Sequence, residues 1–185
     1  MKRLVEATLY RDAGAVKRYH VKRTHRTQTI AEHTFGMLML VKQVAGPFLD
    51  ETRMVDMYEA ILHHDLPELF TGDIPAPIKR VHPDLGPLMN SIEEGLAPLY
   101  MNVDDLYPED AALVKWADRM ELVLWCLEEV RMGNTNLIPT VSRGLGWILA
   151  VHIPECAQAL TTEVVVDAHS VGIAPATGAE LEMNA

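Results

Sequence analysis

The stretch "ILHHDLPELFTGDIPAPIKR", residues 61–80, decides how the sequence is interpreted. His63, His64 and Asp65 stand side by side where an apolar helical pattern ends, and further acids follow within the next turns. Histidine suits the C-terminal end of a helix, because its cationic form interacts favourably with the helix dipole. The dipole does not favour Asp65 there. Two interpretations therefore stay open: a polar helix end, or part of a metal site whose other ligands lie far away in the chain.

Around this stretch the periodicity of apolar residues is helical nearly throughout. Breakers such as Gly46-Pro47 and Gly133-Asn134 mark the helix ends. An alternative is a short strand at the valine run 164–166. The sequence predicts an all-α, single-domain helical bundle over residues 1–168 and a mobile tail over 169–185. The expected helices cover residues 3–14, 30–46, 50–65, 67–70, 83–100 and 108–134, with one or two more between 137 and 169.

A chain of 185 residues that is 49% hydrophobic is long enough for one compact core. Its apolar runs fall short of a signal peptide at the N-terminus and of a membrane span elsewhere. The two cysteines lie in apolar surroundings, which suggests a reducing compartment. We therefore expect a cytoplasmic protein that does not engage a membrane.

The formal net charge of −10 disfavours binding to long nucleic acids, which need a broad basic surface. The charge is unevenly distributed, because half of the 16 Lys and Arg residues lie within the first 26 residues. One basic segment in an acidic protein suits a small anion held at one site. A solvated charged face explains the same pattern equally well.

Besides His64 and Asp65, two other polar residues border apolar helical faces. His33 follows the core stripe of its predicted helix, and Asp118 lies in the middle of another helix. Each has an ordinary explanation, since His33 suits a core histidine and Asp118 an ion pair with Lys115 or Arg119. Together the four residues offer two imidazoles and two carboxylates from three separate helices. That mixture suits Zn, Mn, Co or Fe(II), with open positions where a metal activates water.

Three blocks of sequence carry a resemblance to a known family: "AEHTFGMLML" (31–40), "HHDLPELFTGDIPAPIK" (63–79) and "LVKWADRMELVLWCLEEVRMGN" (113–134). In order and spacing they resemble the motifs of the HD-domain phosphohydrolases, named for their adjacent His-Asp pair. The resemblance is to the small branch that contains bacterial deoxyribonucleoside 5′-nucleotidases and phage dATP triphosphohydrolases. It runs from about residue 16 to residue 134, two thirds of the chain.

The resemblance implies a role for each matching residue. Glu68 would orient or deprotonate the attacking water, Arg18 would contact the substrate phosphate, and Asp73 would lie near the sugar or protonate the departing oxygen. The metal ligands would be His33, His64, Asp65 and Asp118. The cofactor would be a divalent transition metal (Zn, Co or Mn), and a second ion such as Mg²⁺ could accompany the outer phosphates. The other substrate contacts would be Tyr19, Val21, Pro77 and Lys79.

Two positions depart from the bacterial nucleotidases. Tyr19 stands where the resemblance predicts Trp, which keeps an aromatic wall but changes the setting of the sugar. Gln28 stands where it predicts Glu, which removes one negative charge that we expect near the phosphates.

Both kinds of relative would cleave the bond between the 5′-oxygen and the α-phosphorus. The abundance of cations favours a deoxynucleoside triphosphate as substrate. Among these, dATP is preferred because the resemblance includes phage dATP triphosphohydrolases. A deoxynucleoside 5′-monophosphate is the alternative. A regulatory module that binds nucleotides without chemistry should lack a ligand or Glu68, and none is lacking. We also expect a homo-oligomer. The cations counted are Lys17, Arg18, Lys22, Arg23, Arg26, Lys79 and Arg80.

Overall fold

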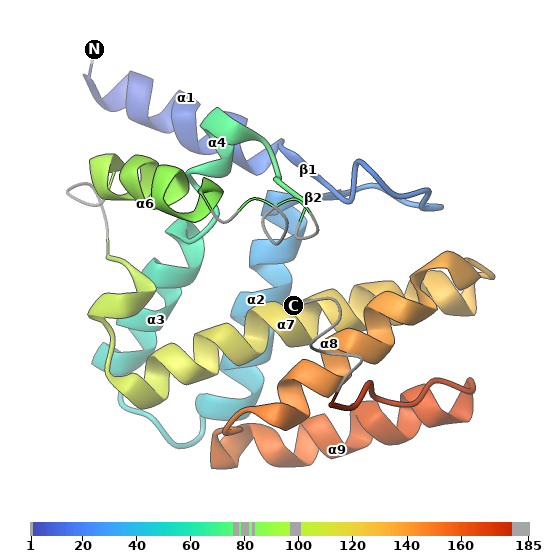
Figure 1. Cartoon of the computed structure of the whole chain (residues 1–185). Coiled ribbons are helices and arrows are strands. Elements are labelled where there is room, and N and C mark those ends of the chain that lie inside the picture. Colours follow the sequence, from blue (N-terminus) through green and yellow to red (C-terminus); the bar gives the residue numbers. More distant parts are fainter. Residues whose placement is uncertain (1, 76–77, 79–81, 83, 97–100, 179–185) are drawn as a thin grey trace.

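The computed structural model describes residues 2–75, 78, 82, 84–96 and 101–178. Over these residues the chain is an all-α bundle, as the periodicity predicted, with one two-stranded ribbon near the N-terminus (Figure 1). The helices are α1 (Lys2–Gly14), α2 (Ile30–Ala45), α3 (Glu51–His63), α4 (Glu68–Thr71), α6 (Leu85–Leu96), α7 (Pro108–Arg131), α8 (Ile138–Ala150) and α9 (Glu155–Ser170). The strands are β1 (Lys17–Arg18) and β2 (Gln28–Thr29), and 3-10 turns span Val103–Asp105 and Thr135–Leu137.

Local chemistry fixes where the site-bearing helices begin. Thr29 caps α2 in a capping box, since its side chain accepts from the Glu32 backbone N–H and the Glu32 carboxylate accepts from the Thr29 N–H. Asp50 caps α3 by accepting from the backbone N–H of Arg53. Pro108 occupies the first turn of α7, where its missing N–H costs nothing. These caps set the register in which α2, α3 and α7 present their polar residues.

The long helix α7 is the centre of the bundle. It packs against α2, α3, α8 and α9, and its buried residues follow both sides of the helix. In Figure 1, α7 crosses the middle of the molecule, with α1, α4 and α6 beyond one side and α8 and α9 on the other. A helix surrounded in this way can carry a polar residue to the point where three helices meet, and Asp118, whose side chain is 42% exposed, lies midway along it.

The ribbon brings the basic segment onto the bundle. Strands β1 and β2 pair antiparallel, with Arg18 opposite Gln28 and Lys17 opposite Thr29. The sequence pattern did not predict these strands, because a strand of two residues is too short to show an alternation of apolar and polar residues. The pairing continues directly into the N-cap of α2, so it holds Arg18 close to the first turn of that helix.

The C-terminal segment differs from the mobile tail that the sequence predicted over residues 169–185. Ile173 and Ala176 are buried, and the backbone N–H of Ala176 donates to the carbonyl of Ser142 on α8. A Cβ added at Gly146 would lie 2.3 Å from the carbonyl oxygen of Ala176, so a glycine is needed there for the segment to pack. The small and polar residues of this segment predicted mobility, because the helix on which they pack, α8, is distant from them in sequence. Residues 179–185 lie outside the described residues.

The valine run 164–166 is part of α9, not a strand. Met37, Met54 and Met57 are core residues, and Met39 is exposed. Among the described residues, no helix is both long enough and apolar enough to cross a bilayer.

Candidate metal centre

Three helices bring their polar residues to one point. His33 lies in the first turns of α2, His64 follows the end of α3, and Asp118 is in mid-α7. One ligand atom from each of these residues lies within 4.8 Å of the other two. The Nε2 atom of His33 lies 3.1 Å from Oδ1 of Asp118, and the two imidazole centroids are 5.5 Å apart. Residues 33, 64 and 118 therefore converge, as the metal-site interpretation required.

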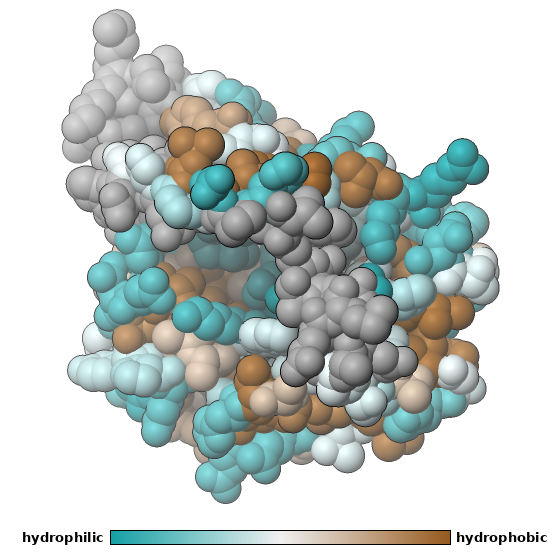
Figure 2. Space-filling view, in the orientation of Figure 1, coloured by the Kyte–Doolittle hydropathy of each residue, from teal (hydrophilic) through white to brown (hydrophobic). Residues whose placement is uncertain are grey.

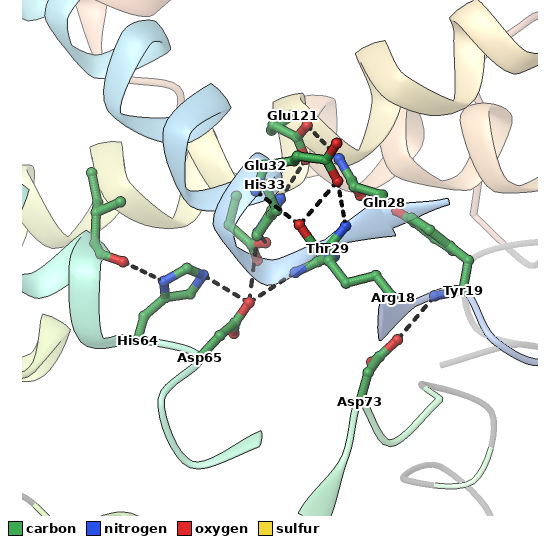
Figure 3. Close-up of polar contacts among 12 residues, drawn as sticks. Arg18, Tyr19, Gln28, Thr29, Glu32, His33, His64, Asp65, Asp73 and Glu121 are labelled. Atoms are coloured by element: carbon green, nitrogen blue, oxygen red, sulfur yellow. Dashed lines mark hydrogen bonds and ion pairs between the residues drawn. The ribbon is translucent and has the colours of Figure 1, made fainter. Parts of the chain in front are cut away.

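Asp65, the fourth expected ligand, borders the same cluster. Its Oδ2 atom lies 3.2 Å from Nε2 of His64 and 3.8 Å from Nε2 of His33 (Figure 3). The same oxygen accepts a hydrogen bond of 2.8 Å from Nη1 of Arg18. Asp65 thus joins the imidazoles to the guanidinium that the resemblance assigns to phosphate.

Hydrogen bonds at Nδ1 fix how both imidazoles are turned. Nδ1 of His64 contacts the carbonyl oxygen of Ile61 at 2.7 Å, and Nδ1 of His33 contacts the Glu121 carboxylate. An oxygen that only accepts requires the proton on Nδ1, so in the neutral ring, which is the form that binds a metal, the lone pair on Nε2 faces the cluster. A ligating histidine is usually held in this way. Glu121 was missed in the sequence, although it follows Asp118 by three residues and therefore shares its helix face.

The donors fit a divalent ion. The Nε2 atoms of His33 and His64 are buried, and neither has a well-aligned hydrogen bond to any described residue, although carboxylate oxygens lie at ion-pair distances. Buried polar atoms in proteins are normally satisfied, so two orphaned nitrogens aimed at one point call for a ligand. Two imidazole nitrogens with carboxylate oxygens suit Zn, Co, Mn or Fe(II).

The charges in the cluster stabilise one another. Burial lowers the pKa of His64, but the charge of Asp65 and the ion pair with it outweigh burial and raise that pKa to about 9. Desolvation raises the pKa of Asp118, whereas the contact with His33 lowers it, to about 2. The pKa of Asp65 is held well below its usual range by His64 and Arg18 despite burial. Both carboxylates are therefore ionised at neutral pH, which is the form that binds a cation.

Glu68 and Arg18 lie beside the cluster. Glu68 is buried at the start of α4, one helical turn after His64, and its charge raises the pKa of Arg18. Arg18 is largely buried, and the nearby acids Asp65, Asp118 and Glu68 all favour its charged form. A carboxylate and a guanidinium thus flank the candidate metal ligands.

Tyr19 and Asp73 hold the wall of the site together. The backbone N–H of Tyr19 donates to Oδ2 of Asp73 at 3.1 Å (Figure 3). Tyr19 has a φ of 57°, a left-handed conformation that is uncommon for a non-glycine residue and is found more often at functional sites than elsewhere. Its ring stacks on Trp125, with centroids 4.7 Å apart and planes 4° from parallel. The aromatic wall expected at position 19 is therefore a two-ring stack fixed to α7.

The structure does not test the other expected substrate contacts, which stay predictions. Val21 is 61% exposed on the loop between β1 and β2. Pro77 and Lys79 lie outside the described residues. The face of the molecule shown in Figure 2 has a hollow between α6 and α7.

Two expectations about charge need correction. Gln28 was expected near the phosphates, but it is 2% exposed and donates to Glu121 at 2.7 Å, because β2 faces α7. Arg26 was counted among the phosphate cations, but it pairs with Glu128 and Glu129 on α7. Lys22 donates to Thr140 on α8 at 2.7 Å. The basic loop is thus partly committed to contacts within the protein.

Known proteins resemble the chain in sequence and in fold. A dATP triphosphohydrolase of Acinetobacter phage SH-Ab 15497 is 27% identical over 79% of this chain and 78% of its own length. A 5′-deoxynucleotidase of Enterobacter sp. (strain 638) is 25% identical over 69% of this chain and 74% of its own.

Two solved structures share the fold. An HD-domain phosphohydrolase from Listeria innocua superposes with a TM-score of 0.71 at 16% identity, covering 97% of this chain and 92% of that one. The HD phosphohydrolase of cyanophage S-2L, solved with dA and one catalytic Zn²⁺ ion, has a TM-score of 0.56 at 21% identity, covering 96% and 90%.

The family itself follows from the first part of the chain. Residues 7–102, which include β1, α2, α3 and the His64-Asp65 pair, match the family described as 5′-deoxynucleotidase YfbR-like. The bundle has the HD-domain fold. The names of the two sequence relatives above both describe hydrolysis of a deoxynucleotide. This chain belongs to the YfbR-like 5′-deoxynucleotidase family and is a metal-dependent HD-domain phosphohydrolase of deoxynucleotides.

Proposed function

We propose that the enzyme hydrolyses the bond between the 5′-oxygen and the α-phosphorus of a deoxynucleoside triphosphate, releasing the deoxynucleoside and triphosphate, with dATP as the preferred substrate. The observation that carries this proposal is the convergence of His33, His64 and Asp118 beside the Arg18–Asp65 pair. The phage relative, named as a dATP triphosphohydrolase, supports the choice of substrate. The cytoplasm is the expected location, and assembly into a homo-oligomer stays a prediction.

The residues that would hold the metal are His33, His64, Asp65 and Asp118. When bound, a divalent ion supplies a Lewis acid that polarises a phosphate oxygen and lowers the pKa of water. Zinc is the first candidate, because the cyanophage protein was solved with catalytic Zn²⁺, and Co²⁺ or Mn²⁺ suits the same donors. A second ion such as Mg²⁺ would accompany the outer phosphates.

The protein's own side chains divide the remaining work. Arg18 binds a phosphate oxygen, because a guanidinium matches the forked geometry of phosphate and stays charged beside Asp65. Glu68 orients the attacking water and accepts its proton, acting as general base. Asp73 protonates the departing 5′-oxygen or binds the sugar, held in place by the Tyr19 backbone. Tyr19 and Trp125 give the sugar side of the site a rigid wall.

A deoxynucleoside 5′-monophosphate is the second candidate substrate, and a specific observation favours it. Arg26 and Lys22 are bound to α7 and α8, so the described residues leave fewer cations for a long phosphate chain than the sequence suggested. The match to a 5′-deoxynucleotidase family agrees with the shorter substrate.

The phosphate product distinguishes these reactions. The purified protein is incubated with Co²⁺ or Mn²⁺ and a panel of deoxynucleoside mono- and triphosphates, and the products are separated by ion-exchange chromatography. Inorganic triphosphate from dATP supports the triphosphohydrolase. Orthophosphate from monophosphates with intact triphosphates supports the 5′-nucleotidase. Turnover of neither class with any metal rejects the proposed function.

A further inference from the structure

We propose that Gln28 and Glu121 form a positioning relay for the proposed metal ligand His33, so this inference rests on the metal site of the proposed function. The relay links strand β2, helix α7 and helix α2 (Figure 3). We assign Gln28 and Glu121 a positioning role and no contact with substrate. They act through the imidazole, by fixing its tautomer and the direction of its Nε2 lone pair.

The contacts form a continuous chain. Nε2 of Gln28 donates to Oε1 of Glu121 at 2.7 Å, and Oε2 of Glu121 receives Nδ1 of His33. All three side chains are shielded, since Gln28 is 2% exposed, His33 0% and Glu121 9%. Hydrogen bonds to a carboxylate in such surroundings are strong and poorly replaced by water. Each oxygen of Glu121 is therefore committed to one partner.

The amide at position 28 is the member that the chemistry requires. A carboxylate only accepts hydrogen bonds, so its partner on the far side from His33 has to donate. A glutamine donates, whereas an ionised glutamate would place two negative charges 2.7 Å apart in a buried setting. Glu121, on helix α7, supplies the carboxylate that the Gln28 amide contacts. The contact with Glu121 explains why a glutamine, and not the glutamate that the resemblance predicts, suits position 28.

Gly36 gives the relay room. It lies one helical turn after His33, where α2 faces α7, and a Cβ added there would lie 2.7 Å from Cγ of Glu121. Glycine inside a helix costs about 0.5–1 kcal/mol relative to alanine. The glycine lets the Glu121 side chain pass close to the α2 backbone and reach the ring. Three positions on separate elements are therefore matched to one orientation of His33.

The relay is also connected to Arg18, the residue proposed to bind phosphate. Gln28 lies opposite Arg18 in the ribbon, and Arg18 donates to Asp65. Fixing the Gln28 side chain to α7 therefore fixes the strand pair that carries Arg18. We expect that loosening the relay weakens metal affinity first, because His33 is the direct recipient.

The test compares Gln28→Glu with Gln43→Glu, the same exchange on the exposed side of α2. The readout is Co²⁺ affinity from its visible absorption, with kcat and KM at saturating Co²⁺. We expect Gln28→Glu to lower the affinity about 10- to 100-fold, the usual effect of losing a partner of a ligating histidine. Gln43→Glu should match the unchanged enzyme, and KM should move less than metal affinity.

A second variant covers misfolding. If circular dichroism shows that Gln28→Glu does not fold, Glu121→Gln keeps the shape and removes the charge, and it should weaken Co²⁺ binding similarly. Folded variants that bind Co²⁺ as tightly as the unchanged enzyme overturn the relay, even where nucleotides are hydrolysed. Weakened Co²⁺ binding in the variants supports the relay, and an unchanged enzyme that binds Co²⁺ without hydrolysing nucleotides rejects only the proposed function.

Discussion

Nη1 of Arg18 donates to Oδ2 of Asp65 at 2.8 Å, so the cation proposed for phosphate rests on a carboxylate proposed for the metal. Both side chains are mostly buried, with 12% and 16% of their surfaces exposed. The pair holds Arg18 charged and in place before a phosphate arrives. It also couples the two halves of the site electrostatically, since Asp65 is shared between two positive groups.

Replacing Arg18 should therefore separate binding of metal from turnover. In Arg18→Ala the phosphate loses its guanidinium, and we expect kcat/KM to fall by about 10²-fold or more. Co²⁺ affinity should stay the same or rise, because a positive charge leaves the neighbourhood of Asp65. Parallel Co²⁺ titration and steady-state kinetics measure both. Loss of Co²⁺ binding in this variant would show that Arg18 serves the metal site and not the phosphate.

Replacing Glu68 should lower turnover without loss of metal, whereas replacing a metal ligand should lower both. Glu68→Gln keeps the size of the buried side chain but removes the proton acceptor, so we expect unchanged metal content and a fall in turnover of about 10²-fold or more. Asp65→Asn should lose metal and turnover together. Glu59→Gln, on the exposed side of α3, is the matched control and should behave like the unchanged enzyme. Full turnover by Glu68→Gln would remove Glu68 from the mechanism.

A buried carboxylate away from the metal site should govern stability in acid. Glu129 accepts from the backbone N–H groups of His25 and Arg26 and from Asn134, so these bonds hold its pKa below the ordinary value despite burial. A lowered pKa in the folded state means that the stabilisation is complete above the unfolded value of about 4.3 and is lost as pH falls through the folded value.

Glu129→Gln should consequently reduce the free energy of unfolding at pH 7 by about 1–3 kcal/mol and flatten its decline below about pH 4.3. Urea unfolding at several pH values measures this. The neighbouring Glu128→Gln is the control, because Glu128 is exposed and its ion pair should contribute less than about 1 kcal/mol. Parallel acid limbs for Glu129→Gln and the unchanged enzyme would contradict the assignment.

Packing of the C-terminal segment on α8 predicts whether a Gly→Ala change raises or lowers the stability of the protein. Gly146→Ala should destabilise the protein by about 1–3 kcal/mol, because its Cβ meets the carbonyl of Ala176 at 2.3 Å. Gly95→Ala, on α6, should instead stabilise by up to about 1 kcal/mol, since no described atom lies within 4 Å of its added Cβ. Chemical unfolding of both variants decides the matter, and equal stabilisation by both would mean that the segment does not pack on α8.

Sequence patterns predicted the helices because their signals are local. The capping residues Thr29 and Asp50 and the apolar stripes lie within the elements that they define. His33, His64 and Asp118 were found because each is a polar residue at the edge of an apolar face, and the family resemblance joined them. Glu121 and the true setting of Gln28 were missed because their contact spans 93 residues. No local pattern reveals such a pairing.

The central claim is that three helices hold one divalent ion, and diffraction from crystals grown with Zn²⁺ tests it most directly. The anomalous signal at the zinc edge should show an ion about 2.0–2.2 Å from Nε2 of His33, Nε2 of His64 and carboxylate oxygens of Asp65 and Asp118. An ion bound elsewhere, or one from which Asp118 and the two imidazoles remain apart, would contradict the account.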